Sequence, residues 1–101
     1  MLYGLQNTTI EAINSVFRNH QNIEEIILYG SRAKGNYTTG SDIDLSIKGS
    51  NFTLTDLLKI ENELDDLMLP YKIDISLYHT INNPELIEHI KRVGIIWNIK
   101  L

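Results

Sequence analysis

Two short stretches of alternating apolar and polar residues constrain the fold of this chain more than any other feature. Apolar side chains occupy every second position of residues 42–48, and the same pattern returns in residues 71–78. Because successive side chains of a β-strand point to opposite faces, each stretch predicts a strand with one buried face and one polar face. Aspartates lie on the polar faces, Asp42 and Asp44 on the first strand and Asp74 on the second. The chain is therefore expected to build a sheet with an acidic face.

The other elements follow from the helical spacing of apolar residues and from turn residues. The expected order is a helix at about residues 8–19, a buried strand at 25–29, a loop at 30–41 with one helical turn near 32–34, a strand at 42–48, a helix at about 54–68, a strand at 71–78, a helix at about 84–93 and an edge strand at 95–99. This order predicts an α/β (α+β) fold, in which a small mixed sheet is flanked by helices in one two-layer domain spanning residues 1–101.

Polar residues at the helix starts support these boundaries. Thr8 and Glu11 have the spacing of a capping box, and Thr53 or Thr55 can cap the second long helix. Asn83, followed by a proline, marks the beginning of the last helix. Each predicted helix therefore has a candidate residue that binds its first backbone N–H groups.

The composition excludes several classes of function. The 101 residues include nine Lys or Arg against 13 Asp or Glu, a net charge of -4, whereas nucleic-acid binding through a broad surface needs clustered basic residues. Cysteine is absent, so no disulfide, thiolate metal site or thiol nucleophile can form. The apolar stretches are too short to span a membrane, and the N-terminal residues show no signal-sequence pattern. We therefore expect a cytoplasmic protein with no membrane contact and no direct nucleic-acid binding.

The aspartates predict a site for divalent cations. Asp42 and Asp44 are two residues apart on a strand and share one face, and Asp74 can join them if the two strands are neighbours. Converging carboxylates are what a two-metal phosphoryl or nucleotidyl transfer requires. An Asp-x-Asp pair alone is also found in phosphatases and glycosyltransferases, and exposed strands carry aspartate by chance. Three aspartates on polar strand faces are harder to explain by chance, because aspartate is disfavoured in strands.

The loop after the first strand has the composition of a phosphate-binding turn. Its sequence Gly30-Ser31-Arg32-Ala33-Lys34-Gly35 supplies backbone N–H groups, a hydroxyl and two cations. It matches neither the Walker pattern nor the dinucleotide-binding glycine pattern. Taken alone, it fits an ordinary strand-to-helix turn with solvated basic side chains at least as well.

Three segments have to be considered together: Gly30-Ser31-Arg32-Ala33-Lys34-Gly35, Ser41-Asp42-Ile43-Asp44-Leu45 and Ile73-Asp74-Ile75. In combination they resemble the minimal nucleotidyltransferase family of the DNA polymerase β superfamily. The signature of that family is Gly-Ser-x-Ala-x-Gly followed by Ser-Asp-x-Asp-Leu, with a third aspartate on a later strand. The resemblance covers nearly the whole chain, and no core position departs from the pattern.

The resemblance implies roles for individual residues. Asp42, Asp44 and Asp74 would be the catalytic residues and would hold two Mg²⁺ ions, and Asp74 would also orient or deprotonate the acceptor hydroxyl. ATP would be the substrate. The nucleotide-binding residues implied in this way are Gly30, Ser31, Arg32 and Ser41.

The resemblance also implies a partner. Members of this size are similar to MntA-type antitoxins, which are paired with all-helical HEPN toxins and transfer AMP from ATP to a toxin tyrosine. The chain lacks the Arg-x4–6-His pattern of the toxin, so it would be the antitoxin. A domain this small has little surface to enclose a second substrate, which favours a protein acceptor, with a homodimer or a hetero-oligomer as the assembly.

Other functions also fit these residues. The domain can neutralise a partner by binding alone, or the nucleotidyl group can go to a small molecule or to RNA. The base of the nucleotide, the acceptor residue and the number of groups transferred are open at this point. His20, His79 and His89 have no mutual ligand spacing and are interpreted as surface residues.

Overall fold

The computed structural model describes residues 1–99, and the last two residues of the predicted 1–101 domain lie outside the described part. The elements in chain order are α1 (Asn7–Phe17), β1 (Glu25–Tyr29), α2 (Ser31–Lys34), β2 (Ile43–Lys48), α3 (Leu54–Asp65), β3 (Ile73–Leu77), the 3-10 helix η1 (Tyr78–Thr80), α4 (Pro84–Val93) and β4 (Ile95–Ile96). Every helix and strand that the sequence predicts is present.

The strands form one mixed sheet in the order β3-β2-β1-β4. β1 pairs antiparallel with β2 and with β4, whereas β2 and β3 run parallel. The prediction of a small mixed sheet flanked by helices is confirmed. β3 and β4 are the two edge strands, and the strands that carry the aspartates are direct neighbours.

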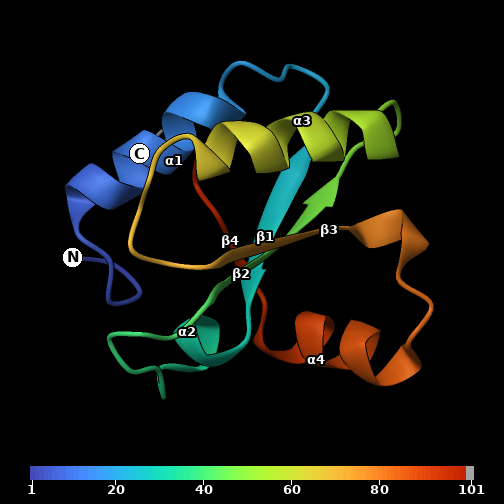
Figure 1. Cartoon of the computed structure of the whole chain (residues 1–101). Coiled ribbons are helices and arrows are strands. Elements are labelled where there is room, and N and C mark those ends of the chain that lie inside the picture. The colour runs from blue at the N-terminus through green and yellow to red at the C-terminus, as the bar shows by residue number, and fades with distance from the viewer. Residues whose placement is uncertain (100–101) are drawn as a thin grey trace.

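The core lies between the apolar face of the sheet and the pair α1 and α3, which Figure 1 shows together on one side. Ile43, Leu45 and Ile47 of β2 are fully buried there, as their alternation predicts. α4 and the short α2 lie on the other side of the strands in Figure 1, and both contact β1. The predicted two-layer arrangement is therefore incomplete, because α4 also covers part of the polar face.

Capping explains most of the helix boundaries. The Thr53 side chain accepts a hydrogen bond from the Asp56 N–H, and the Asp56 carboxylate accepts one from the Thr53 N–H, which makes a capping box at the start of α3. Asn83 caps α4 as predicted. The capping box predicted for Thr8 and Glu11 is wrong: α1 begins one residue earlier at Asn7, and Glu11 instead forms an ion pair with Arg18.

Several predicted elements extend beyond the observed ones: the first helix ends at Phe17 rather than residue 19, and the strand predicted at 71–78 spans only Ile73–Leu77. α3 ends at Asp65 rather than residue 68, and Met68 adopts a left-handed backbone conformation at φ 55° that ends any helix. The edge strand predicted at 95–99 pairs only over Ile95–Ile96. Beyond it, the Trp97 indole N–H donates to the buried Asn14 side chain of α1, which fixes the C-terminal segment against the core.

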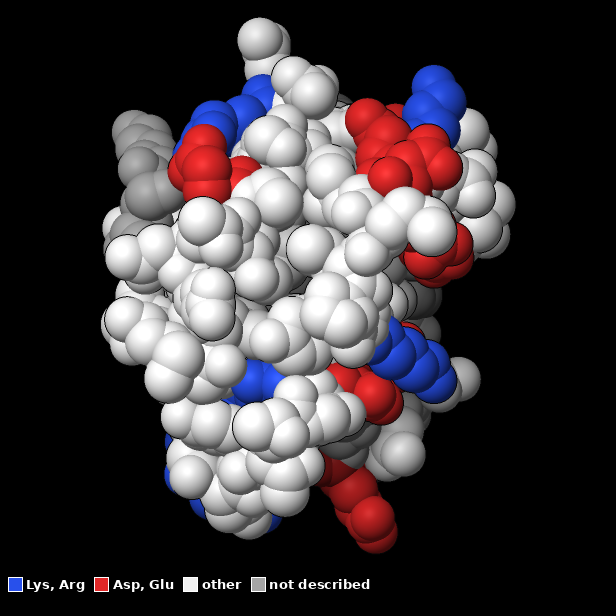
Figure 2. Space-filling view, turned by 60° about the vertical axis from the view of Figure 1, so that its left-hand side comes forward, with Lys and Arg blue, Asp and Glu red and all other residues white. Residues whose placement is uncertain are grey.

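The face of the molecule in Figure 2 carries no broad basic patch of described residues. Among the helices of residues 1–99, none is long and apolar enough to cross a lipid bilayer. Figure 2 shows one face of the molecule, on which charged side chains lie in small separate groups between uncharged residues. That distribution agrees with the net negative charge of the sequence.

Candidate active site

The register of β2 and β3 sets two of the predicted aspartates side by side. Asp44 is the direct cross-strand partner of Asp74, and on the other side Asp44 pairs with Tyr29 of β1. Cross-strand partners project from the same face, with Cβ atoms roughly 5 Å apart. The carboxylates of Asp44 and Asp74 therefore meet on the polar face, although 30 residues separate them in the sequence.

Asp42 lies just before β2, not within it as the sequence predicts, because the strand begins at Ile43. Its side chain is exposed. Its negative charge still acts on Asp44, two residues further along. Asp42 and Asp74 thus each lie close enough to Asp44 for their charges to act on it.

The pKa of the Asp44 carboxyl depends on its burial and on the neighbouring charges. Partial burial raises the pKa of the Asp44 carboxyl above its usual value, and the charges of Asp74 and Asp42 raise it further. His89 and Lys72 oppose that shift only in part. Repulsion between neighbouring carboxylates disfavours their ionised forms, so a cation bound between them would be stabilising.

The glycine turn approaches the same point from β1. Gly30 has φ 75° and ψ -156°, a conformation that is essentially restricted to glycine. A Cβ at this position would collide with the Asp44 carboxylate. The missing side chain therefore lets the backbone of the turn lie directly against the carboxylate, and Ser31 follows as the first residue of α2.

Arg32 is placed differently from a free phosphate-binding side chain. It is 2% exposed, and its guanidinium donates hydrogen bonds to the carbonyl oxygens of Tyr3, Thr39 and Ser41. The Tyr37 and Tyr71 rings lie over it, with centroids 5.4 Å and 5.1 Å from the guanidinium carbon. Arg32 thereby ties the N-terminal turn and the loop before Asp42 to α2.

Ser41 is also engaged within this loop. Its hydroxyl accepts a hydrogen bond from the Thr38 N–H at 2.9 Å, and its carbonyl accepts two from Arg32. The loop is therefore fixed at the residue directly before Asp42. In this arrangement Arg32 and Ser41 act on the position of the first aspartate.

Three features of the site were not found from the sequence. His89, interpreted as a surface residue, is half-buried, and its Nε2 accepts a hydrogen bond from the Gly30 N–H at 3.2 Å. The Tyr29 ring lies edge-on to His89, and burial raises the pKa of the Tyr29 phenol, opposed by a hydrogen bond with Ser76. The Ser76 hydroxyl donates to Ser46. The sequence signal for Ser46 and Ser76 is that each lies two positions after an aspartate on the same strand, whereas no such signal marks Tyr29 or His89.

The donor set fits a hard divalent cation. Mg²⁺ prefers carboxylate oxygens and retains water or substrate phosphate as further ligands, so one or two carboxylates per ion are enough. Within residues 1–99, no group of three or more His, Asp or Glu side chains is arranged so that it could hold a metal ion. The crowding at Asp44 and the backbone cradle at Gly30 are the features that favour a cation and an anionic substrate together.

Comparison with known proteins agrees with this geometry. The family described as "Polymerase beta, Nucleotidyltransferase" matches residues 11–98. The chain is 32% identical over 84 residues to MJ0126 of Methanocaldococcus jannaschii, covering 75% of this chain and 85% of that protein. It is 38% identical over 82 residues to MJ1547 of the same organism, covering 71% and 67%. Both relatives are named as candidate protein adenylyltransferases.

Solved structures share the fold. A chain of a toxin–antitoxin complex with AMP-PNP has a TM-score of 0.70 at 16% identity, with 88% of this chain and 72% of that chain covered. A chain of the complex of the tri-AMPylated Shewanella oneidensis HEPN toxin with its MNT antitoxin has a TM-score of 0.66 at 16% identity, covering 93% and 72%.

Proposed function

The chain belongs to the polymerase beta nucleotidyltransferase family, and we propose that it transfers AMP from ATP to a tyrosine hydroxyl of a HEPN-type partner protein and so acts as an antitoxin. The observation that carries the proposal is the register that sets Asp44 beside Asp74 against the glycine turn. In this arrangement the carboxylates that can bind divalent cations lie next to the glycine turn that can bind the triphosphate of ATP. The reaction would take place in the cytoplasm.

In this proposal Asp42 and Asp44 would hold both Mg²⁺ ions, and Asp74 would hold the catalytic one. Bound Mg²⁺ would activate the attacking oxygen and neutralise charge on the triphosphate. Gly30 and Ser31 contact the phosphates: the missing side chain of Gly30 lets a phosphate approach the turn closely, and Ser31 contacts it through its hydroxyl. Arg32 and Ser41 act indirectly, since they fix the loop that ends at Asp42.

The transfer is an in-line displacement. The acceptor hydroxyl oxygen attacks the α-phosphorus of ATP, the bond from this phosphorus to the oxygen bridging to the β-phosphorus breaks, and pyrophosphate leaves. The hydroxyl proton passes to the Asp74 carboxylate and then to solvent. Most of the rate enhancement would come from positioning and from charge neutralisation, because the protein forms no covalent intermediate.

Two findings support a protein acceptor and a HEPN partner. The two M. jannaschii relatives are named for transfer to protein, and the structural neighbours are chains of toxin–antitoxin complexes. The small domain also has little surface with which to enclose a second substrate by itself.

The test is to incubate the purified chain with Mg²⁺, ATP labelled on the α-phosphate and the helical protein encoded by the neighbouring gene. We expect label on a tyrosine of that protein, and a loss of at least about 10²-fold in rate for the double variant Asp42→Asn/Asp44→Asn. The matched control is Asp66→Asn, an exposed carboxylate at the end of α3 that lies outside the site.

Equal labelling by the wild type and by the double variant would refute the catalytic role. If that variant also protects cells from the partner as well as the wild type does, neutralisation occurs by binding alone. Label on RNA or a small molecule, with none on the protein, would instead move the acceptor to that class.

A further inference from the structure

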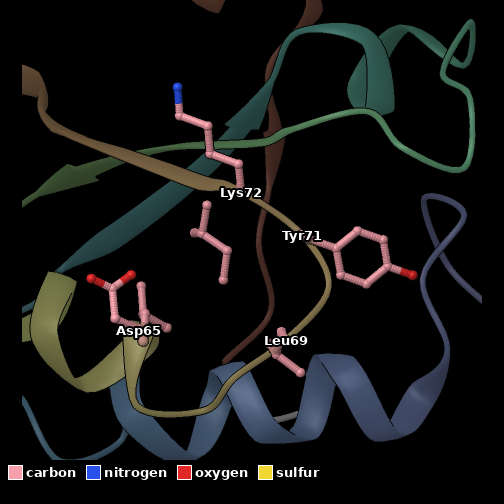
Figure 3. A pocket seen from close by; sticks show the side chains of 6 residues that line it. Asp65, Leu69, Tyr71 and Lys72 are labelled. Atoms are coloured by element: carbon pink, nitrogen blue, oxygen red, sulfur yellow. The ribbon is translucent and has the colours of Figure 1, made fainter.

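A groove follows the outer edge of β3 and ends beside Asp74. It consists of two adjoining cavities, one of about 240 Å³ that reaches Tyr71 and one of about 210 Å³ that reaches Asp74 and Ile75. Residues common to both are Leu64, Asp65, Lys72 and Ile73. Figure 3 shows that one wall comes from the end of α3 and the other from the segment leading into β3.

The backbone of β3 presents unpaired groups to this groove. The Ile43 N–H donates to the Lys72 carbonyl, and in this parallel register the even-numbered residues of β3 bond to β2. The N–H and C=O groups of Ile73 and Ile75 therefore point outward, and among residues 1–99 no backbone or side-chain group bonds to them. Such an edge is a template for one more strand.

The charge of the groove selects the kind of segment that fits. Glu61 and Asp65 line it, and within the described residues neither forms an ion pair. Figure 3 shows the Lys72 ammonium pointing away from Asp65. Glu61, Asp65 and Asp74 make the groove acidic, so an extended segment with basic residues complements it.

Strand geometry links this edge to the chemistry. In a strand added beside β3, the residue opposite Asp74 projects its side chain from the Asp74 face, and its Cβ lies roughly 5 Å from that of Asp74. The neighbouring residues point to the opposite face, where the cavity beside Leu64 and Leu69 can receive an apolar side chain. A hydroxyl residue opposite Asp74 would thus stand at the reaction site.

The geometry points to the outer edge of β3 as the docking site for the acceptor: a basic, extended segment of the partner protein pairs with Ile73–Ile75 as a fifth strand of the sheet and presents its hydroxyl residue to Asp74. This inference rests on the proposed function, since it assigns how the acceptor of that reaction is recognised. Main-chain hydrogen bonds supply affinity, and Glu61 and Asp65 supply the preference for basic segments.

The test uses a blocked peptide, Lys-Thr-Val-Tyr-Val-Thr-Lys, as the probe. Hydrogen exchange of the backbone amides, followed by NMR without ATP, measures docking independently of catalysis. We expect the amides of Ile73 and Ile75 to exchange at least about tenfold more slowly with the peptide, because pairing buries them. A peptide with proline in place of both valines lacks the N–H groups for pairing and should give no protection.

Adjacent carboxylates at the end of α3 provide matched variants. Asp65 lines the groove, whereas Asp66 does not and is exposed. At about 0.15 M salt, where exposed charges beyond about 8 Å are largely screened, Asp65→Lys should weaken peptide binding at least about fivefold and Asp66→Lys less than twofold. ATP binding should be the same in both variants.

The outcomes separate this inference from the proposed function. If Ile73 and Ile75 stay unprotected while the peptide receives AMP in an Asp44-dependent way, docking on β3 is wrong and the reaction stands. If both amides are protected but neither the peptide nor the neighbouring-gene protein receives AMP, docking stands and the reaction is wrong. Protection of both amides without any peptide would assign the edge to a second copy of this chain and overturn the inference.

Discussion

The surroundings of the buried Arg32 and of the three aspartates differ in how many hydrogen bonds they offer to the charged groups. Arg32 is buried, yet its guanidinium donates to three carbonyl oxygens and lies over the Tyr37 and Tyr71 rings. Asp42, Asp44 and Asp74 lie on the polar side of the sheet, and within residues 1–99 no group donates a hydrogen bond to their carboxylates.

The difference shows which region is complete without a ligand. Carbonyl dipoles and aromatic faces stabilise the arginine cation within the chain itself. Burial raises the pKa of the Asp44 carboxyl, and the charges of Asp74 and Asp42 raise it further, so the aspartates gain most from a bound cation. The two regions are joined at Ser41, whose carbonyl accepts from Arg32 and whose neighbour is Asp42. Through Ser41, the hydrogen bonds of Arg32 therefore help to fix the position of Asp42.

The largest effect is expected at Asp74. Asp74→Asn removes a charge from the aspartate group and the acceptor for the hydroxyl proton, so turnover should fall at least about 10²-fold while ATP binding changes much less. Measuring AMP transfer and ATP affinity on the same variant checks this. A variant with unaltered turnover would remove Asp74 from the mechanism.

Arg32→Met tests whether the hydrogen bonds of the buried guanidinium stabilise the fold. The substitution leaves the carbonyl oxygens of Tyr3, Thr39 and Ser41 without their donor, and we expect the free energy of unfolding to fall by about 3 kcal/mol. Urea denaturation measures the change. Lys34→Met, an exposed basic residue two positions on, is the control and should stay within about 0.5 kcal/mol. Equal effects of the two substitutions would contradict a structural role for Arg32.

Gly30→Ala tests the contact between the turn and the aspartates. The alanine would have to adopt a glycine-specific backbone conformation and would displace the Asp44 carboxylate, so a loss of about 2 kcal/mol is expected together with a loss of activity. Gly35→Ala is the matched control, since Gly35 also has a positive φ of 88° but nothing lies within 4 Å of its added Cβ. It should cost about 1 kcal/mol and leave activity nearly intact. If Gly35→Ala removes activity equally, the contact with Asp44 is not the cause.

Added Mg²⁺ should stabilise the aspartate region. At ten times its Kd, the ion would add roughly 1.4 kcal/mol to the free energy of unfolding of the wild type, seen as a rise in Tm. Asp44→Asn should lose most of that rise. Sodium chloride at the same ionic strength is the control for general screening. The same shift in wild type and variant would place the ion elsewhere.

The smallest expected effect is the pH dependence of stability through Asp44. Its pKa is raised on folding, so the stability linked to its protonated form is present below the unfolded value of 3.8 and is lost as pH rises through the folded pKa. Asp44→Asn should therefore be slightly more stable than the wild type at pH 7, by less than about 1 kcal/mol because solvent screens a half-exposed group. The advantage should vanish at acid pH.

Asp56→Asn provides the control of opposite sign. Hydrogen bonds from Thr53 lower the pKa of the Asp56 carboxyl, so its contribution is present above the unfolded value and is lost as pH falls. This variant should be less stable than the wild type at neutral pH, with a difference that shrinks on acidification. Urea midpoints at two pH values measure both variants. A difference for Asp44→Asn that does not change with pH would point to packing rather than charge.

Local patterns predicted much of the fold. The alternation around Ile43 and Leu45 correctly indicated which face of β2 is buried, and Thr53 and Asn83 marked the starts of α3 and α4. The pattern at Thr8 failed, because a capping box is only one way to begin a helix and Glu11 finds a stronger partner in Arg18. These successes and this failure all concern residues within a few positions of one another.

The site was predictable only in part. The motif marked the aspartates and the glycine turn, but Arg32 looks like a solvated cation in the sequence and is a buried one in the fold. His89 could not be connected with Gly30, 59 positions away, because the contact depends on α4 folding back over β1. Nor could the open edge of β3 be identified before the strand order was known.

The sequence by itself determined which residues face the same way along each strand and where the chain must turn, since a period of two and the backbone freedom of glycine are local properties. Only the tertiary structure decided that Asp44 stands beside Asp74, that Arg32 is enclosed by carbonyls and rings, and that β3 lies at an edge. These depend on strand order and on helix packing, which are set by the burial of apolar side chains far apart in the chain.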